Sequence, residues 1–266
     1  MSIQKSMHKF AVCCLNISEG QNVELINRIA HSAVQNQTPS SKHFKCETTV
    51  LSVYSDPIFN RSNITIASTV TNLAQSVYNA CAVAYQNIDL CQHLDPKHPR
   101  LGVIDLIPIH PISPTTSVEE CSHVAHQIGQ LITSNFPSQA SVFYFGKADQ
   151  GNRDLVQRRK GLSWFSNNED SIIPDFGVFT KEFGITGIGA LPYMSVLNVL
   201  LDTNDIQFGK DIASNIRHRN KATGLKGIQA MAFLKGNKVE IACNVDTNDL
   251  QSEVRFFFTV KTFFIY

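Results

Sequence analysis

Apolar residues follow two spacings along the first part of the chain. Compact apolar or β-branched runs are typical of strands, whereas apolar residues repeated every three or four positions are typical of helices. The predicted strands lie at 9–17, 48–55, 63–70, 103–109 and 142–146. The predicted helices lie at 23–33, 73–88 and 118–132, with a short basic helix at 153–161 that ends at Gly161. Without that short helix, the order is β-α-β-β-α-β-α-β.

Two predicted helices are preceded by capping signals. Ser18-x-x-Gln21 and Ser117-x-x-Glu120 both fit a capping box, which satisfies free N–H groups at a helix start. The hairpin between two β-α units resembles a split βαβ arrangement, as in ferredoxin-like sheets. We therefore expect a mixed sheet with helices on one face.

A second, smaller unit follows a change in composition. Residues 166–190 are rich in Gly, Ser and Asn, which predicts an interdomain loop. Beyond it, a helix is predicted around 206–219 and Gly236-Asn237 fits a hairpin turn. Three strands are predicted, at 194–201, 228–234 and 238–245.

Composition narrows the class of protein. A 43% apolar, 17% charged chain is typical of a soluble globular protein, and a net charge of +1 gives no sign of a nucleic-acid surface. No apolar run is long enough for a membrane helix, and the N-terminus lacks a secretory h-region. Seven cysteines, an odd number, then favour reduced thiols and a cytoplasmic location. The spacing of Cys91, His93 and His98 fits no standard zinc pattern, so we expect no metal.

Two stretches leave alternatives open. Pro99 favours an extended backbone at His98, and the charges of Lys97 and Arg100 lower the pKa of an imidazole between them. A neutral imidazole near pH 7 is a usable general base, and the alternative is a histidine that caps a loop and hydrogen-bonds to the backbone. GITGIGA, residues 184–190, fits either a flexible linker or a loop whose backbone approaches a flat ligand.

Several segments together resemble one family. HPRLGVIDLIPI, residues 98–109, resembles the His-Pro-Arg-Met/Leu-Gly-x-x-Asp segment of the formiminotransferase domain family. The resemblance keeps its order from about residue 10 to about 250. It also includes NISEG (16–20), Asn60-Arg61, FYFGKA (143–148), PDFG (174–177), GIQAMAF and VEIACNV.

The resemblance implies an α+β fold of two ferredoxin-like α/β subdomains with mixed sheets, the second truncated. It implies an N-terminal subdomain over 8–175, a folate-loop linker over 176–190 and a partial C-terminal subdomain over 191–250, followed by an apolar tail over 251–266. It also implies a homodimer that transfers a formimino group from N-formiminoglutamate to N5 of tetrahydrofolate, a step of histidine degradation. Tetrahydrofolate is then the acceptor substrate, and neither nucleic acid nor a membrane is a partner.

The resemblance also assigns residues. It places the catalytic general acid/base at His98. It implies substrate binding by Asn16, Ser18, Glu19, Arg61, Lys97 and Arg100. It implies a folate loop made of Gly177, Val178, Phe179, Thr180, Lys181, Glu182, Phe183 and Gly184.

The chain also departs from the family pattern. Ser52 and Tyr54 stand where the family has Asp-x-Asp, with Asp56 two residues on, and Lys147 replaces a glutamate. These departures favour an alternative from another class, a non-catalytic folate-binding or protein-interaction module that keeps the fold.

Overall fold

The computed structural model describes residues 9–35, 47–93, 98–162, 172–217 and 222–246. Lys97 and the tail over 251–266 lie outside these ranges. The chain divides into two compact units, Met1–Leu191 and Pro192–Tyr266, each described below by itself.

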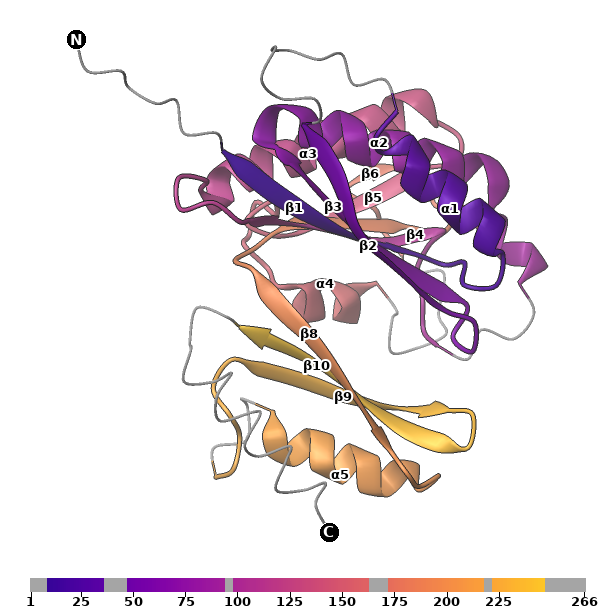
Figure 1. Cartoon of the computed structure of the whole chain (residues 1–266), viewed down its shortest axis with the longest axis vertical. Helices are drawn as coiled ribbons and strands as arrows, with labels where there is room; N and C mark the ends of the chain where they lie inside the picture. Colours follow the sequence, from indigo (N-terminus) through magenta and orange to yellow (C-terminus); the bar gives the residue numbers. More distant parts are fainter. Residues whose placement is uncertain (1–8, 36–46, 94–97, 163–171, 218–221, 247–266) are drawn as a thin grey trace. The chain divides into compact units, whose positions relative to one another are not determined.

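The first unit is a seven-stranded mixed sheet in the order β2-β3-β1-β4-β7-β5-β6 (Figure 1). The β1 strand pairs antiparallel with both β3 and β4, whereas β4, β7 and β5 run parallel. The strands are β1 Phe10–Ile17, β2 Thr48–Asp56, β3 Arg61–Thr69, β4 Ile104–Pro111, β5 Ser141–Gly146, β6 Phe176–Gly177 and β7 Thr186–Ala190. The helices are α1 Val23–Ser32, α2 Val70–Asn87, η1 Leu90–Gln92, α3 Val118–Asn135 and α4 Leu155–Gly161.

Helices cover the two faces of this sheet unequally. The α1, α2 and α3 helices pack on one face, and α4 lies on the other (Figure 1). Alternation along β5 divides its side chains between the faces, because successive residues of a strand point to opposite sides. Tyr144 joins the core under the three long helices, whereas Phe143 and Phe145 pack with Leu162 on the α4 side.

The predicted helix starts differ in outcome. The capping box of Ser117 and Glu120 is confirmed at α3. The box predicted at Ser18 and Gln21 is wrong, because Asn22 caps α1 through its side chain. The Ser18 hydroxyl instead donates to the Gly102 carbonyl at 2.7 Å and is buried.

The loop predicted over 166–190 also differs from the structure. Within its described part, Thr186–Ala190 forms β7, a fully buried strand between β4 and β5. Phe176–Gly177 forms β6, which pairs with β5. These residues are therefore part of the first unit's sheet rather than a linker between units.

The second unit is a three-stranded antiparallel sheet in the order β8-β10-β9. Its elements are β8 Met194–Leu201, α5 Ile206–Ile216, β9 Ile228–Lys235 and β10 Lys238–Asp246. Ala213 and Ile216 of α5 pack against the apolar side of the strands, which include Val239 and Ile241. The predicted α+β fold with two subdomains is confirmed. No helix in the described ranges combines the length and apolarity of a membrane span.

Gly184→Ala is expected to destabilise the first unit. Gly184 has a φ of 65°, which costs an L-residue about 1–2 kcal/mol. An added Cβ would also collide with the Leu101 carbonyl oxygen. Thermal denaturation should show a lower Tm than for Gly161→Ala, whose Cβ meets no atom within 4 Å. An equal Tm for the two variants would show that the positive φ of Gly184 and its approach to Leu101 do not exclude a side chain.

Candidate functional site

The first unit contains a cluster of polar side chains around one buried carboxylate, that of Asp105. Asp105, on β4, is 0% exposed, and its Oδ2 accepts from Arg61 at 2.6 Å and from Arg159 at 3.2 Å. Its Oδ1 accepts the Leu101 N–H at 2.8 Å. Burial alone would raise the pKa of Asp105, but the two guanidinium charges and these hydrogen bonds lower it overall. Asp105 is therefore a buried anion that fixes two arginines from different elements.

Arg61 connects this carboxylate to His98. It begins β3, and its guanidinium donates to the Asn16 side chain as well as to Asp105. The same guanidinium lies 2.8 Å from the Pro99 carbonyl oxygen and 2.9 Å from Nδ1 of His98. Since Asp105 holds Arg61, and Arg61 contacts the His98 segment, the imidazole position is set by the sheet beneath it.

His98 is neutral at physiological pH. Burial, and then the charge of Arg61, lower its pKa from 6.5 to about 4. The imidazole ring also lies edge-on to Phe59, with 5.1 Å between ring centroids. The pKa of His98 is therefore lowered as the sequence predicted, with burial and then Arg61 as the largest causes in the structure.

The contacts of Nδ1 do not select one tautomer of His98. Nδ1 lies 2.7 Å from the Pro99 carbonyl oxygen, which only accepts, and 2.9 Å from the Arg61 guanidinium, which only donates. In either tautomer the neutral ring carries one nitrogen lone pair, which is the group able to take a proton from a substrate.

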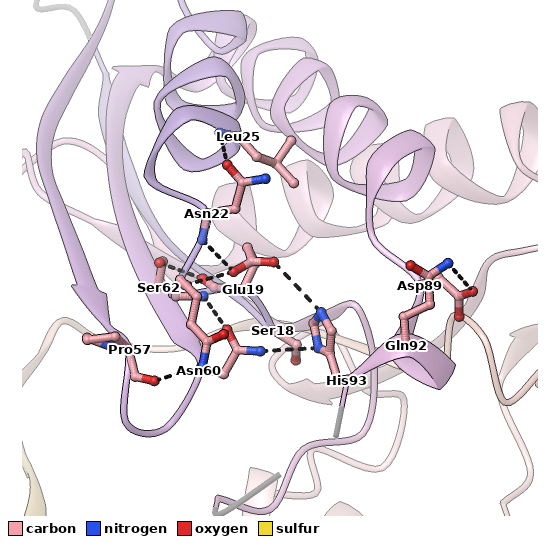
Figure 2. Close-up of polar contacts among 12 residues, drawn as sticks. Ser18, Glu19, Asn22, Leu25, Pro57, Asn60, Ser62, Asp89, Gln92 and His93 are labelled. Carbon is pink, nitrogen blue, oxygen red and sulfur yellow. Dashed lines mark hydrogen bonds and ion pairs between the residues drawn. The ribbon is translucent and has the colours of Figure 1, made fainter. Parts of the chain in front are cut away.

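The turn after β1 is tied to the segment that carries His98. The Ser18 N–H donates to the Val103 carbonyl at 2.8 Å, in addition to the hydroxyl contact with Gly102. Glu19 accepts the N–H groups of Gln21 and Asn22, and its carbonyl accepts from Ser62 at 2.6 Å (Figure 2). These contacts give Ser18 a structural role, whereas Asn16 and Arg61 lie directly within the cluster.

The loop predicted to bind folate lies beside the same segment. Gly102 bridges to Gly184, and the Val103 N–H donates to the Phe183 carbonyl at 2.9 Å. Gly177, Val178, Lys181 and Glu182 are exposed, whereas Phe179 and Thr180 are half-buried. Residues 98–103 and 180–184, far apart in the sequence, are thus neighbours in the fold.

Two consecutive arginines of α4 each bind a different carboxylate of this region, Asp175 or Asp105. Arg158 donates to both carboxylate oxygens of Asp175, at 2.7 and 2.8 Å, just before the 177–184 loop. Arg159 donates to Asp105, and burial lowers the pKa of its guanidinium to about 10. The sequence alone did not indicate Arg158 or Arg159. It indicated Asp105 only as the final Asp of the family segment HPRLGVID and as a lone carboxylate in the apolar run VIDLIPI.

The residues at or beside the departures from the family pattern form a surface ion pair, a strand pair and a turn. Lys147 forms an exposed ion pair with Glu119 at 3.4 Å. Tyr54 is 59% exposed on β2, opposite Asn63 of β3. Asp56 is buried, and its carboxylate accepts the N–H groups of Ile58 and Phe59. It therefore shapes the turn that places Phe59 against His98.

Acidic, histidine and cysteine side chains do not gather into a metal site in the described ranges. No group of three or more of them there is arranged to hold a metal ion. The buried cysteines at 81, 121 and 243 belong to the apolar cores.

Comparisons with known proteins agree on one family. The model of the formiminotransferase domain, N-terminal subdomain, matches residues 10–191. Formimidoyltransferase-cyclodeaminase of Sus scrofa is 29% identical over 264 residues, which cover 96% of this chain and 46% of that protein. Glutamate formimidoyltransferase of Streptococcus pyogenes serotype M1 is 26% identical, with 96% of this chain and 83% of that protein covered.

An archaeal relative gives a similar result. Glutamate formimidoyltransferase of Thermoplasma acidophilum is 28% identical over 243 residues, which cover 88% of this chain and 75% of that protein. The chain therefore spans about half the length of the pig protein and three quarters or more of the two shorter relatives.

Proposed function

Because the chain belongs to the formiminotransferase domain family, we propose that it transfers a formimino group from N-formiminoglutamate to N5 of tetrahydrofolate. The observation that carries the proposal is a neutral imidazole at His98, held by Arg61 and Asp105 beside the 177–184 loop. A base, a cationic cluster and a loop with an exposed backbone are the parts that such a transfer needs.

His98 serves both halves of the reaction. As N5 of tetrahydrofolate attacks the amidine carbon, the proton of N5 passes to the neutral imidazole of His98. The imidazolium then donates this proton to the glutamate nitrogen, the bond between that nitrogen and the amidine carbon breaks, and glutamate leaves. The low pKa of His98 makes its protonated form a strong acid, which favours the second half of the reaction.

The cations near His98 suit the donor substrate. In N-formiminoglutamate only a nitrogen and the α-carbon separate the amidine carbon from the α-carboxylate. In tetrahydrofolate the p-aminobenzoyl group keeps the glutamate carboxylates far from N5. A guanidinium close to the reacting carbon therefore meets the donor carboxylate. We assign this role to Arg100, whose pKa is lowered by burial and by the nearby charge of Arg61.

The folate is assigned to the loop from Gly177 to Gly184. Glycines at both ends have positive φ, 82° and 65°, and the Gly184 N–H donates to the Thr180 carbonyl at 2.7 Å. This turn presents backbone next to residues 101–103, where a flat pterin ring could lie within reach of His98. A homodimer is part of the same proposal and rests on the resemblance alone, whereas a cytoplasmic location rests on the cysteine content of the sequence.

The proposal is tested by incubating the purified protein with both substrates and following 5-formiminotetrahydrofolate. Turnover that requires both substrates supports the transferase. Folate binding by calorimetry without turnover would instead support a non-catalytic folate-binding module.

The pH dependence of the reaction should reflect His98. The base must be neutral, so kcat/KM is expected to fall as the pH drops, with a midpoint near the free-enzyme pKa of about 4. A donor carboxylate bound beside Arg61 offsets the positive charge and raises the pKa of His98, so the midpoint for kcat should lie at higher pH. Steady-state kinetics across pH in the parent protein measure both. A kcat/KM midpoint near the ordinary histidine value of 6.5 would contradict this account.

A further inference from the structure

A second histidine lies between a carboxylate and an arginine of the proposed donor site. His93 follows η1, and its Nδ1 lies 2.7 Å from Nη1 of Arg100 and 3.4 Å from Nδ2 of Asn60. Its Nε2 lies 3.7 Å from Oε2 of Glu19. Figure 2 shows the imidazole of His93 directed toward Glu19 on one side and Asn60 on the other.

These partners are consistent with one tautomer. A guanidinium and the nitrogen of a side-chain amide only donate, so the Nδ1 atom they approach must accept. A neutral ring then carries its proton on Nε2, which faces the carboxylate of Glu19. The surroundings of His98 differ, because its Nδ1 faces a carbonyl oxygen as well as a guanidinium.

The Glu19 end of this chain of contacts is fixed. Oε1 of Glu19 accepts the N–H groups of Gln21 at 2.7 Å and Asn22 at 2.9 Å, at the start of α1. The other carboxylate oxygen is the one that faces His93. The start of α1 therefore orients Glu19, Glu19 orients His93, and His93 accepts from Arg100.

We propose that His93 is a positioning residue for donor binding: it holds the Arg100 guanidinium at the place where the α-carboxylate of N-formiminoglutamate binds. The inference rests on the proposed function, because it takes the donor as the ligand of Arg100. The two histidines then have different roles: His93 positions the Arg100 guanidinium, and His98 transfers the proton.

The charges around His93 support an accepting, neutral ring. Burial, and then Arg100, lower the pKa of His93, whereas Glu19 and Asp89 act in the opposite direction and leave the pKa below its usual value. Protonation of Nδ1 would replace an accepted hydrogen bond by repulsion between two cations. The contact with Arg100 thus belongs to the neutral state that predominates at physiological pH.

The first test needs no activity. Long-range ¹H–¹⁵N spectra of the full chain without substrates report which nitrogen of a histidine carries the proton, and a His93→Asn sample identifies the His93 signals. The expected result is an Nε2–H tautomer for His93 at neutral pH. A proton on Nδ1 would overturn the proposal, because that atom could not accept from Arg100.

The second test compares two substitutions. Asn places its side-chain oxygen near the position of Nδ1 and still accepts from Arg100, whereas Leu fills similar space and accepts nothing. His93→Leu is expected to raise the dissociation constant for N-formiminoglutamate about tenfold by calorimetry, the effect of losing one hydrogen bond to a charged group. His93→Asn should bind the donor nearly as tightly as the parent, and tetrahydrofolate binding should be unchanged in both.

Kinetics separate positioning from catalysis. In an active parent, His93→Leu should raise KM for the donor and leave kcat nearly unchanged. Equal donor affinity in the parent and His93→Leu, or no rescue by His93→Asn, would overturn the proposal. A parent that binds the donor but shows no turnover would overturn the proposed transferase alone, since the calorimetric comparison still decides the role of His93.

Discussion

Replacing His98 with Ala is expected to lower kcat by about 10²–10⁴-fold, the usual contribution of one general acid/base. The variant loses the atom that takes the N5 proton and returns it to the glutamate nitrogen. Arg61 and Asp105 still have each other as partners, so the fold should persist. Initial rates of 5-formiminotetrahydrofolate formation at saturating substrates measure the loss.

A matched control is available on α3. His123 is exposed, so His123→Ala removes an imidazole from the protein without touching the proposed site. It should keep the activity of the parent. A His98→Ala protein that folds, binds folate and keeps full activity would show that the proton transfers run through another group, even if the reaction is the one proposed.

Replacing Asp105 with Ala is expected to destabilise the protein by about 3–5 kcal/mol, as for breaking a buried ion pair from one side. The substitution leaves the buried guanidiniums of Arg61 and Arg159 without the carboxylate that holds them. Urea denaturation at pH 7 measures the loss of unfolding free energy. Glu119→Ala, which removes an exposed partner of Lys147, should have a much smaller effect.

The effect of Asp105 also has a defined pH dependence. Its pKa in the folded protein lies below the ordinary value of 3.8. The carboxylate therefore contributes its full stabilisation above that ordinary value, and the contribution is lost as the pH falls toward the folded-state pKa. The stability difference between the parent and Asp105→Ala should narrow only in that acidic range. Equal stability of the two proteins at neutral pH would contradict the central place given to Asp105.

Much of the fold could be predicted because its signals are local. The stripe of α2 and the capping box of α3 are set by residues within a few positions of one another, and both appear in the structure. The α1 cap was misplaced because Ser18 is satisfied by Gly102, a partner that only the fold brings near.

The β7 strand could not be predicted for a related reason. Its sequence, TGIGA, has the glycine content of a loop. In the structure a Cβ on Gly187 would lie 2.6 Å from the Phe143 ring, and one on Gly189 would collide with Phe145. The glycines make room for aromatic rings on the neighbouring strand, so they are a packing requirement that a single segment cannot reveal.

The candidate site was likewise predictable from the sequence only where its residues stand in short local motifs. His98, Arg61 and Arg100 stand in short motifs, and the structure brings all three into one connected region. Arg159 reaches Asp105 from α4, on the face of the sheet opposite the long helices, across 54 residues of sequence. No periodicity or spacing in the sequence encodes that contact, since it depends on how the sheet and α4 pack.

The most direct test of the account follows the transferred carbon itself. The protein would be given N-formiminoglutamate labelled with ¹³C in the formimino group, together with tetrahydrofolate, and the label followed by NMR. The label is expected to move to N5 of the folate with release of one glutamate for each carbon transferred. Label that stays on glutamate while folate is bound at the 177–184 loop would contradict it.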